Sequence, residues 1–232
     1  MTTEKSTSEL LLLSIAVVGG TGKEGSGLAL RWAHSGYRVI IGSRDAAKAE
    51  ATAEELNAQL GGKYVLGTDN LSAAQQADIV VLSVPYSAHK DTLNAIKSAL
   101  VGKILIDVTV PLKPPSIRTV HLPEGHAAAL EAQKILGDAT HVVAAFQNVS
   151  AVHLKDLDKK VECDVLVCSD HAEAKADVIR LVEASGMVGI DAGPLANAIA
   201  VESLTPVLLY INKHYGVKSS GIRITGLDGH KS

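Results

Sequence analysis

A glycine-rich segment near the N-terminus has the residue spacing that holds a pyrophosphate. It fits the pattern G-x-G-x-x-G through Gly20, Thr21, Gly22, Lys23, Glu24 and Gly25. The apolar run Ser14–Val18 precedes it and an amphipathic stretch, Glu24–Ser35, follows it, which is the strand-turn-helix context of a dinucleotide site. Glycines let the backbone approach the phosphates, and the helix N-terminus adds positive potential. The alternative is a glycine-rich turn that binds no ligand.

The end of the second predicted strand distinguishes between the two nicotinamide dinucleotides. Arg38–Gly42 is followed by Ser43 and Arg44, with Lys48 one helical turn further on. NAD-binding domains usually place Asp or Glu here, on the ribose 2′-hydroxyl. Hydroxyl, guanidinium and ammonium groups can instead converge on a 2′-phosphate, and we expect no carboxylate to repel it. The sequence therefore favours NADP(H), against the alternative of an N-cap serine with solvated basic residues.

Short apolar runs alternate with amphipathic stretches, which is typical of an α/β fold with a doubly wound, Rossmann-type parallel sheet. The predicted strands are Ser14–Val18, Arg38–Gly42, Tyr64–Leu66, Ile79–Val84, Ile104–Val110 and His141–Phe146, and the first two helices are Glu24–Ser35 and Asp45–Leu60. Ligands bind such sheets at the carboxyl edge. We therefore add Ser83, Val84, Pro85 and Tyr86, after the fourth strand, and Val110, after the fifth, to the candidate cofactor site.

The pattern changes after residue 150 and predicts a small C-terminal α/β domain over 151–232, behind an NADP-binding domain over 1–150. Its predicted elements are a strand at Cys163–Cys168, a helix at Ala172–Ser185, a strand at Val188–Ile190 and a helix at Leu195–Tyr215 that Pro206 bends. Residues 1–9 are predicted to be a disordered tail. The final helix has more apolar surface than one small domain can cover, which predicts a homodimer.

Composition argues against several classes of protein. A net charge of −3 and 3% aromatic residues favour neither nucleic acid nor a membrane surface as a partner. The apolar run Leu10–Val18 follows an acidic leader and precedes no cleavage site, so we do not expect a signal peptide. Cys163 and Cys168 would point to opposite faces of a strand and are predicted to be reduced. Together these features indicate a cytoplasmic protein.

No acid, base or metal cluster stands out in the sequence. The nine histidines form no H-x-x-x-H pair, and His89, His121, His126, His153, His171 and His214 lie in polar surroundings, where a surface position is favoured. Glu202, beside Ser203 on the last helix, is ambiguous. We therefore assign no catalytic residue and no metal ligand.

With these residues placed, the chain resembles the NADPH-dependent reductases of the deazaflavin coenzyme F420. The segments that carry the resemblance are Val18–Gly22, Gly42–Arg44 with Lys48, Ser83–Tyr86, Ala144–Phe146 with Ser150-Ala151, Asp191–Asn197 and Val201–Pro206. The resemblance implies that Thr21, Gly22, Lys23, Glu24, Ser43, Arg44, Lys48 and Ala151 contact NADP. It also implies that Asn148, Val149, Gly193, Pro194, Leu195 and Asn197 lie near F420, the co-substrate. Family members often carry a histidine where this chain has Gln147-Asn148.

The resemblance implies hydride transfer between NADP(H) and F420. Transfer between two stacked rings needs orientation more than a dedicated acid or base, whereas a carbonyl reductase needs a proton donor. The alternatives are an NADPH-dependent reductase of a small carbonyl, an imine or a flavin, and a non-catalytic NADP sensor that binds a protein partner.

Overall fold

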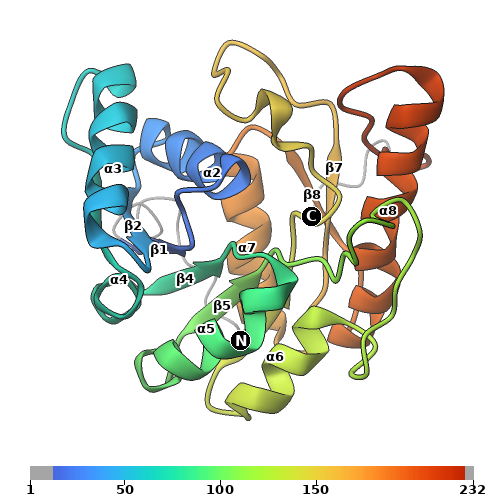
Figure 1. The fold of residues 1–232 in the computed structure, drawn as a ribbon, viewed down its shortest axis with the longest axis horizontal. Helices are drawn as coiled ribbons and strands as arrows, with labels where there is room; N and C mark the ends of the chain where they lie inside the picture. Colours follow the sequence, from blue (N-terminus) through green and yellow to red (C-terminus); the bar gives the residue numbers. More distant parts are fainter. Residues whose placement is uncertain (1–12, 228–232) are drawn as a thin grey trace.

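The computed structural model describes residues 13–227, and its main feature is a six-stranded parallel sheet (Figure 1). The strand order is β3-β2-β1-β4-β5-β6, formed by β1 (Ser14–Val18), β2 (Arg38–Ser43), β3 (Val65–Asp69), β4 (Ile79–Leu82), β5 (Ile104–Asp107) and β6 (His141–Ala144). This order is that of a Rossmann sheet, so the predicted fold class is confirmed. The predicted tail, residues 1–9, lies outside the described residues.

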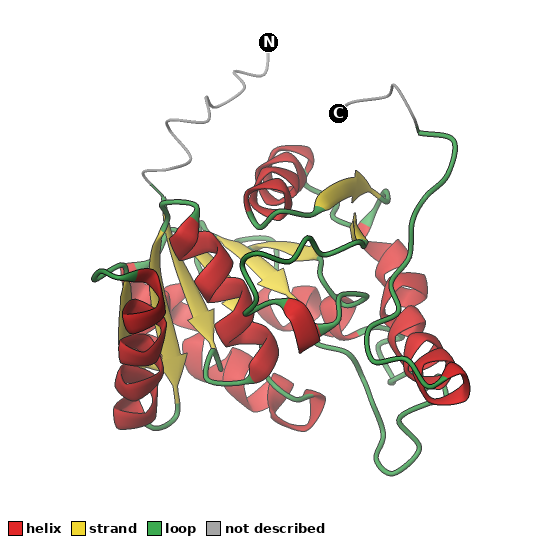
Figure 2. Ribbon diagram, turned by 90° about the horizontal axis from the view of Figure 1, so that it is seen from above, coloured by secondary structure: helices red, strands yellow, loops and turns green. Residues whose placement is uncertain are grey.

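Alternate residues of each strand face two separate hydrophobic layers. Ile15 and Val17 pack in one layer with α2 (Lys23–His34), α3 (Ala46–Leu60) and α7 (Ala172–Ala184). Ala16 and Val18 pack in the other layer with α4 (Asn70–Gln76), α5 (Tyr86–Ile96) and α6 (Ala128–Leu136). Figure 2 shows the resulting cover of helices on both faces of the sheet. Burial on both sides explains why the strands read as continuous apolar runs.

Three strands end earlier than the sequence predicts. The predicted strands at Ile79–Val84, Ile104–Val110 and His141–Phe146 stop at Leu82, Asp107 and Ala144. These three residues are partners in register, so the sheet ends along one line and the polar residues beyond it are free to form loops. The third strand is instead longer than predicted, because it pairs with β2 as far as Ser43 and Asp69.

The C-terminal part adds a second, two-stranded parallel sheet of β7 (Asp164–Val167) and β8 (Val188–Asp191), followed by α8 (Ala198–Tyr215). An antiparallel bridge between Ala144 and Cys168 joins it to β6. The indole nitrogen of Trp32 donates to the Leu181 carbonyl at 2.9 Å, which ties α2 to α7. Residues of both parts therefore pack together in the hydrophobic layer that contains Ile15 and Val17.

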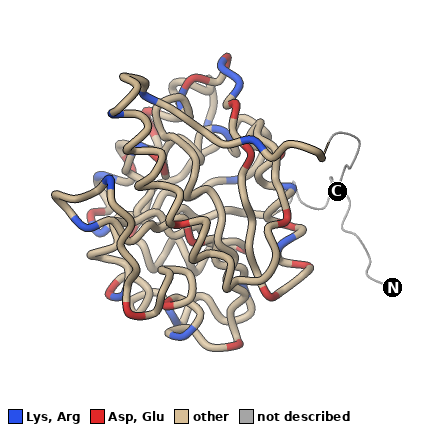
Figure 3. Tube along the Cα trace, turned by 90° about the vertical axis from the view of Figure 1, so that its right-hand side faces the viewer, with Lys and Arg blue, Asp and Glu red and all other residues tan. Residues whose placement is uncertain are grey.

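Other features bear on the sequence predictions. Both cysteines are free and buried, as expected. In residues 13–227, one segment, Leu195–Tyr215, is long and apolar enough to cross a membrane, but core helices of soluble proteins meet the same criterion and one third of it is buried. Figure 3 shows basic and acidic residues interspersed along the trace, with no single-sign face on the side in view.

Candidate functional site

The glycine-rich turn after β1 lies against the end of β4, at the point where the sheet order reverses. Gly19 has a φ of +73°, and a Cβ atom there would come within 2.5 Å of the Ser83 carbonyl oxygen. A Cβ at Gly25 would meet the Cα of Gly20 at 2.9 Å and the Ser83 hydroxyl at 3.0 Å. No side chain in the described part of the chain caps the first turn of α2, so its backbone N–H groups are available to an anion.

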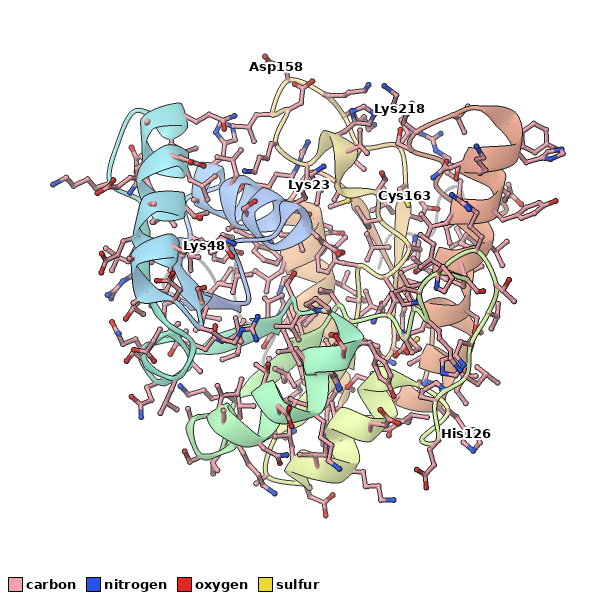
Figure 4. The ribbon with its side chains drawn as sticks, in the orientation of Figure 1. Lys23, Lys48, His126, Asp158, Cys163 and Lys218 are labelled. Carbon is pink, nitrogen blue, oxygen red and sulfur yellow. The ribbon has the colours of Figure 1, made fainter. Side chains whose placement is uncertain are left out.

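One end of the cleft next to this turn is basic. A cavity of about 590 Å³ brings together Thr21, Gly22, Ser43, Arg44 and Lys48, all predicted from the sequence. Figure 4 shows Lys48 on the side of α3 that faces α2 and β1. Arg44 and Lys48 are exposed and have no ion-pair partner among residues 13–227. This end therefore offers two uncompensated cationic groups to a ligand.

Asp45 and Asn70 are among the lining residues of the basic end that the sequence did not predict. Asp45 places a carboxylate in the lining of the same cavity, where we expected no carboxylate to repel a 2′-phosphate. Its Oδ1 accepts the Lys48 backbone N–H at 3.4 Å, as the N-cap of α3, which directs the carboxylate to the helix end. Asn70, at the start of α4, accepts the Gly19 N–H on Oδ1 at 3.2 Å and so holds the glycine turn against β3. Asn70 follows a strand whose end was placed too early.

The other end of the cleft, called the ring end below, is almost uncharged. It is a cavity of about 280 Å³ that shares four residues with the basic end, namely Gly22, Ser83, Val84 and Pro85. The rest of its lining is Lys23, Glu24, Tyr86, Val108, Thr109, Val110, Leu112, Gln147, Val149 and Thr205. The turn after β1, α5, the ends of β5 and β6, and α8 all contribute to it. The structure thus brings the predicted Lys23, Glu24, Tyr86, Val110 and Val149 together.

A buried polar network forms the wall of the ring end. The backbone carbonyl of Asp107 accepts the side-chain N–H of Gln147 at 2.7 Å. The backbone carbonyl of Gln147 accepts the Thr205 hydroxyl at 2.6 Å. Asp107 is fully buried, and its Oδ2 lies 2.7 Å from Nε2 of His89. His89 is 1% exposed, so the predicted surface position of this histidine is wrong. His89, Leu93 and Ile96 share one buried face of α5, a helix that the sequence analysis did not predict.

Three groups in or behind this wall have shifted pKa values. Burial disfavours the charged form of His89, but Asp107 more than offsets it and raises the pKa of the imidazole. Burial raises the pKa of Glu202 to about 8, although its carboxylate accepts the Ala128 and Ala129 N–H groups at 2.7 and 3.0 Å. Glu202 thus caps α6 from α8, which resolves the ambiguity left by the sequence. Burial and a hydrogen bond to Glu131 raise the pKa of Tyr86 to about 12.

Two predicted site residues, Asn148 for the acceptor and Ala151 for NADP, do not line either end of the cleft. Asn148 is buried and donates to the Asp164 carbonyl at 2.7 Å, so it ties β6 to β7. Ala151 begins a short 3-10 helix, η2 (Ala151–His153), that packs on α2, and it does not line either end. Val149 is the one residue of the predicted acceptor set that lines the ring end.

The loop of Gly193, Pro194, Leu195 and Asn197 lies furthest from its predicted position beside the cleft. The Gly193 carbonyl accepts the Ser169 N–H and the Lys175 ammonium, beside the start of α7. That helix start lies at the amino edge of the main sheet, because β7 runs antiparallel to β6. Leu195 is 1% exposed and packs in the core. These four residues therefore line neither end of the cleft within one chain.

A larger cavity of about 800 Å³ opens at this amino edge, between the starts of β4, β5 and β6 and the start of α7. The rings of His141 and His171 lie against each other there, with centroids 4.1 Å apart and planes tilted by 60°. Ligands of doubly wound sheets bind at the carboxyl edge, so the smaller, two-ended cleft is the candidate site.

Comparison with known proteins agrees with this choice. The family "NADP oxidoreductase coenzyme F420-dependent" matches residues 14–111, which contain the whole basic end. An F420-dependent NADP reductase of Methanothermobacter marburgensis is 42% identical over 93% of this chain and 99% of its own length. The chain belongs to the F420-dependent NADP reductase family.

Two further proteins match this chain over nearly the full length of both sequences. The F420-dependent NADP reductase of Methanocaldococcus jannaschii is 41% identical over 93% of this chain and 100% of its own. A crystal structure from Arthrobacter sp., titled as a candidate F420-dependent NADP reductase, superposes with a TM-score of 0.77 and 27% identity, covering 92% of this chain and 99% of its own. The family assignment confirms the resemblance predicted from the sequence.

Proposed function

We propose that this chain transfers a hydride between NADP(H) and coenzyme F420, held together in the two-ended cleft. The observation that carries the proposal is the continuity of a basic end and a nearly uncharged ring end through Gly22, Ser83, Val84 and Pro85. A dinucleotide that runs across the glycine turn would place its phosphates at one end and its nicotinamide at the other. The family members named above supply the identity of the second substrate.

The residues present fit NADP(H). Arg44, Lys48 and the Ser43 hydroxyl would bind the 2′-phosphate, because they converge on one cavity and both cations lack an ion-pair partner in the described part of the chain. The N–H groups at the start of α2 would bind the pyrophosphate. Gly20 and Gly25 would allow the backbone contact that this requires.

The ring end fits two stacked flat rings better than a carbonyl substrate. Val84, Val108, Val110, Leu112 and Val149 supply apolar surface, and the buried network of Asp107, Gln147 and Thr205 fixes the wall. NADPH supplies the hydride, and the protein's task is to hold donor and acceptor about 3–3.5 Å apart with water excluded. Rigid walls on four different elements serve that purpose.

The test is NADPH oxidation with F420, a flavin and small carbonyl or imine compounds compared side by side. We expect rapid oxidation with F420 alone. NADPH stereospecifically deuterated at C4 should deliver its label to the reduced F420 ring without exchange into water. Label lost to solvent, or faster reduction of a flavin or carbonyl, would assign the chain to one of those reductase classes. Tight NADPH binding without turnover would indicate a sensor.

We also propose that the protein is a cytoplasmic homodimer. On α8, Val207 is 44% exposed and Tyr210 56%, whereas Leu208 on the same helix and Leu195 just before it are buried. The apolar patch is therefore smaller than predicted but still present. Light scattering at micromolar concentration should give twice the mass of the chain, and Tyr210→Glu should shift it to the monomer.

A further inference from the structure

Among residues 13–227, Glu24 is the single acidic side chain that lines the ring end. It lies in the first turn of α2, as the last variable residue of the glycine motif, and it is partly buried. Among residues 13–227, no hydrogen bond or ion pair to its carboxyl group is found. A carboxyl group without a partner in a cavity is costly to keep ionised. Burial accordingly raises the pKa of Glu24 to about 8.

The other ionisable groups around the ring end do not compete for this role. Lys23 precedes Glu24 on α2 and also lines this end, but its side chain is exposed whereas Glu24 is partly buried. On α5, the Tyr86 hydroxyl donates to Glu131 at 2.9 Å and stays protonated, since its pKa is about 12. Behind the wall, His89 and Asp107 pair with each other and Glu202 caps α6. No other ionisable residue lines this end, from β4, β5, β6 or α8.

The proposed reaction needs one proton for each hydride. A hydride that leaves C4 of NADPH takes both electrons of that bond, forms a bond to a ring carbon of the deazaflavin, and leaves a cationic nicotinamide. The acceptor gains one negative charge, which a proton on a ring nitrogen neutralises. The balance is NADPH + F420 + H⁺ giving NADP⁺ and reduced F420. A protonated carboxyl group beside both rings can supply that proton, and its carboxylate then faces the new positive charge.

We propose that Glu24 is the proton donor for F420 reduction and the proton acceptor in the reverse direction. This inference rests on the proposed function. After donation, Glu24 regains a proton from water through the open side of the cleft. The arrangement favours hydride transfer in two ways. The proton neutralises the negative charge on the acceptor, and the carboxylate that remains on Glu24 stabilises the positive charge on the nicotinamide.

The first test measures proton exchange on cofactor binding and needs no F420. Isothermal titration calorimetry at pH 7.5, in buffers with different heats of ionisation, counts the protons released. NADP⁺ binding should release a substantial fraction of one proton, because the cationic ring favours ionised Glu24, while NADPH binding should release almost none. Glu24→Gln should abolish the difference. Glu54→Gln, on the exposed face of α3, is the matched control and should keep it.

The second test is the pH profile of turnover. In the wild type, kcat for F420 reduction should fall about tenfold per pH unit above the Glu24 pKa, and kcat for the reverse reaction should rise up to it. Glu24→Gln should lower both by about 10²-fold and flatten both profiles, with NADPH affinity within about threefold of the wild type. If it keeps the rate and the profile, or still releases the proton with NADP⁺, the proposal is wrong.

The two proposals fail in different ways. A wild-type protein that does not reduce F420 overturns the proposed function, whatever Glu24 does. Normal F420 reduction by Glu24→Gln overturns the role of Glu24 alone. NADPH affinity reports whether a variant is folded, and Glu24→Ala, which also lacks an acid, should reproduce the loss if Glu24→Gln does not fold.

Discussion

The two ends of the cleft differ in the kind of side chain that builds them. At the basic end, Arg44 and Lys48 are exposed and project from a strand end and a helix. At the ring end, Asp107, Gln147 and His89 are at most 3% exposed and are linked by hydrogen bonds. Charges in solvent can select a ligand by its charge but cannot fix it closely, whereas a buried network fixes geometry. We infer that cofactor choice and catalytic orientation are separate properties here.

The largest effect on cofactor choice is expected from a substitution at the basic end. Arg44→Ala should weaken NADPH binding by about 1.5–3 kcal/mol, the scale of a hydrogen bond to a charged group, and leave NADH binding nearly unchanged. Saturated kcat should hold, because the ring end is untouched. Equilibrium titration with both nucleotides checks this. Equal losses for NADPH and NADH would mean that Arg44 does not bind the 2′-phosphate. Lys48→Ala should show the same pattern with a smaller loss.

The buried wall should also make stability depend on pH through Glu202. Its folded-state pKa, about 8, is above the unfolded value of about 4.3, so the unfolded state loses its proton first as pH rises. The stabilisation is complete below pH 4 and falls by up to about 1.4 kcal/mol per pH unit until pH 8. Urea unfolding from pH 5 to 9 should therefore show decreasing stability.

Glu202→Gln separates this contribution from that of Glu24, which titrates in the same window. The variant loses one of the two acceptor bonds to the start of α6 and should be less stable by about 1–3 kcal/mol at pH 6. Because it cannot ionise, the difference from the wild type should shrink at pH 9. A difference that is constant with pH would show that Glu202 is ionised in the folded protein.

Gln147→Leu probes the wall itself and should have a smaller effect. The change removes the Gln147 bond to the Asp107 carbonyl, which keeps only the longer bond from the Ala145 N–H at 3.3 Å, at a cost of about 1 kcal/mol. We expect kcat to fall about fivefold to tenfold, with NADPH affinity unchanged, in steady-state kinetics and equilibrium titration. A loss that falls on NADPH affinity instead would mean that the two ends are not independent. Gln133→Leu, on α6 and outside the cleft, is the control.

The same contrast explains what the sequence could predict. The basic end follows from local pattern, since Gly20–Gly25 and Ser43-Arg44 are consecutive residues next to apolar strands, and the structure brings them together as expected. The ring end depends on hydrogen bonds between residues 18 to 58 positions apart, such as His89 and Asp107, or Gln147 and Thr205. Their meeting requires the strand ends and α5, which the sequence analysis misplaced or did not predict.

The position of the loop at Gly193–Asn197 could not be predicted for a related physical reason. Its glycine and proline correctly indicated a turn before the last helix. The edge of the main sheet at which the loop lies depends on the direction of β7 and β8 relative to β6. Hydrophobic periodicity does not encode that direction. The antiparallel bridge at Ala144 and Cys168 reverses that direction and sends the loop to the amino edge.

Tyr86→Phe should have the smallest effect. It tests whether the hydroxyl of Tyr86, which lines the ring end, serves stability or proton transfer. The hydroxyl donates to Glu131 Oε2, whose other oxygen accepts the Gly125 N–H, so this bond holds the start of α5 to the segment before α6. Glu131 is only partly buried, and water can replace the lost donor. We therefore expect a loss of about 0.5–1 kcal/mol in the free energy of unfolding. Turnover and its pH profile should not change, because the aromatic ring stays in place and the hydroxyl points to Glu131 rather than to a substrate. Urea unfolding and the pH dependence of kcat, measured on the same preparation, check both statements. A tenfold fall in kcat together with a changed pH profile would make Tyr86 the proton donor at the ring end and would remove that role from Glu24.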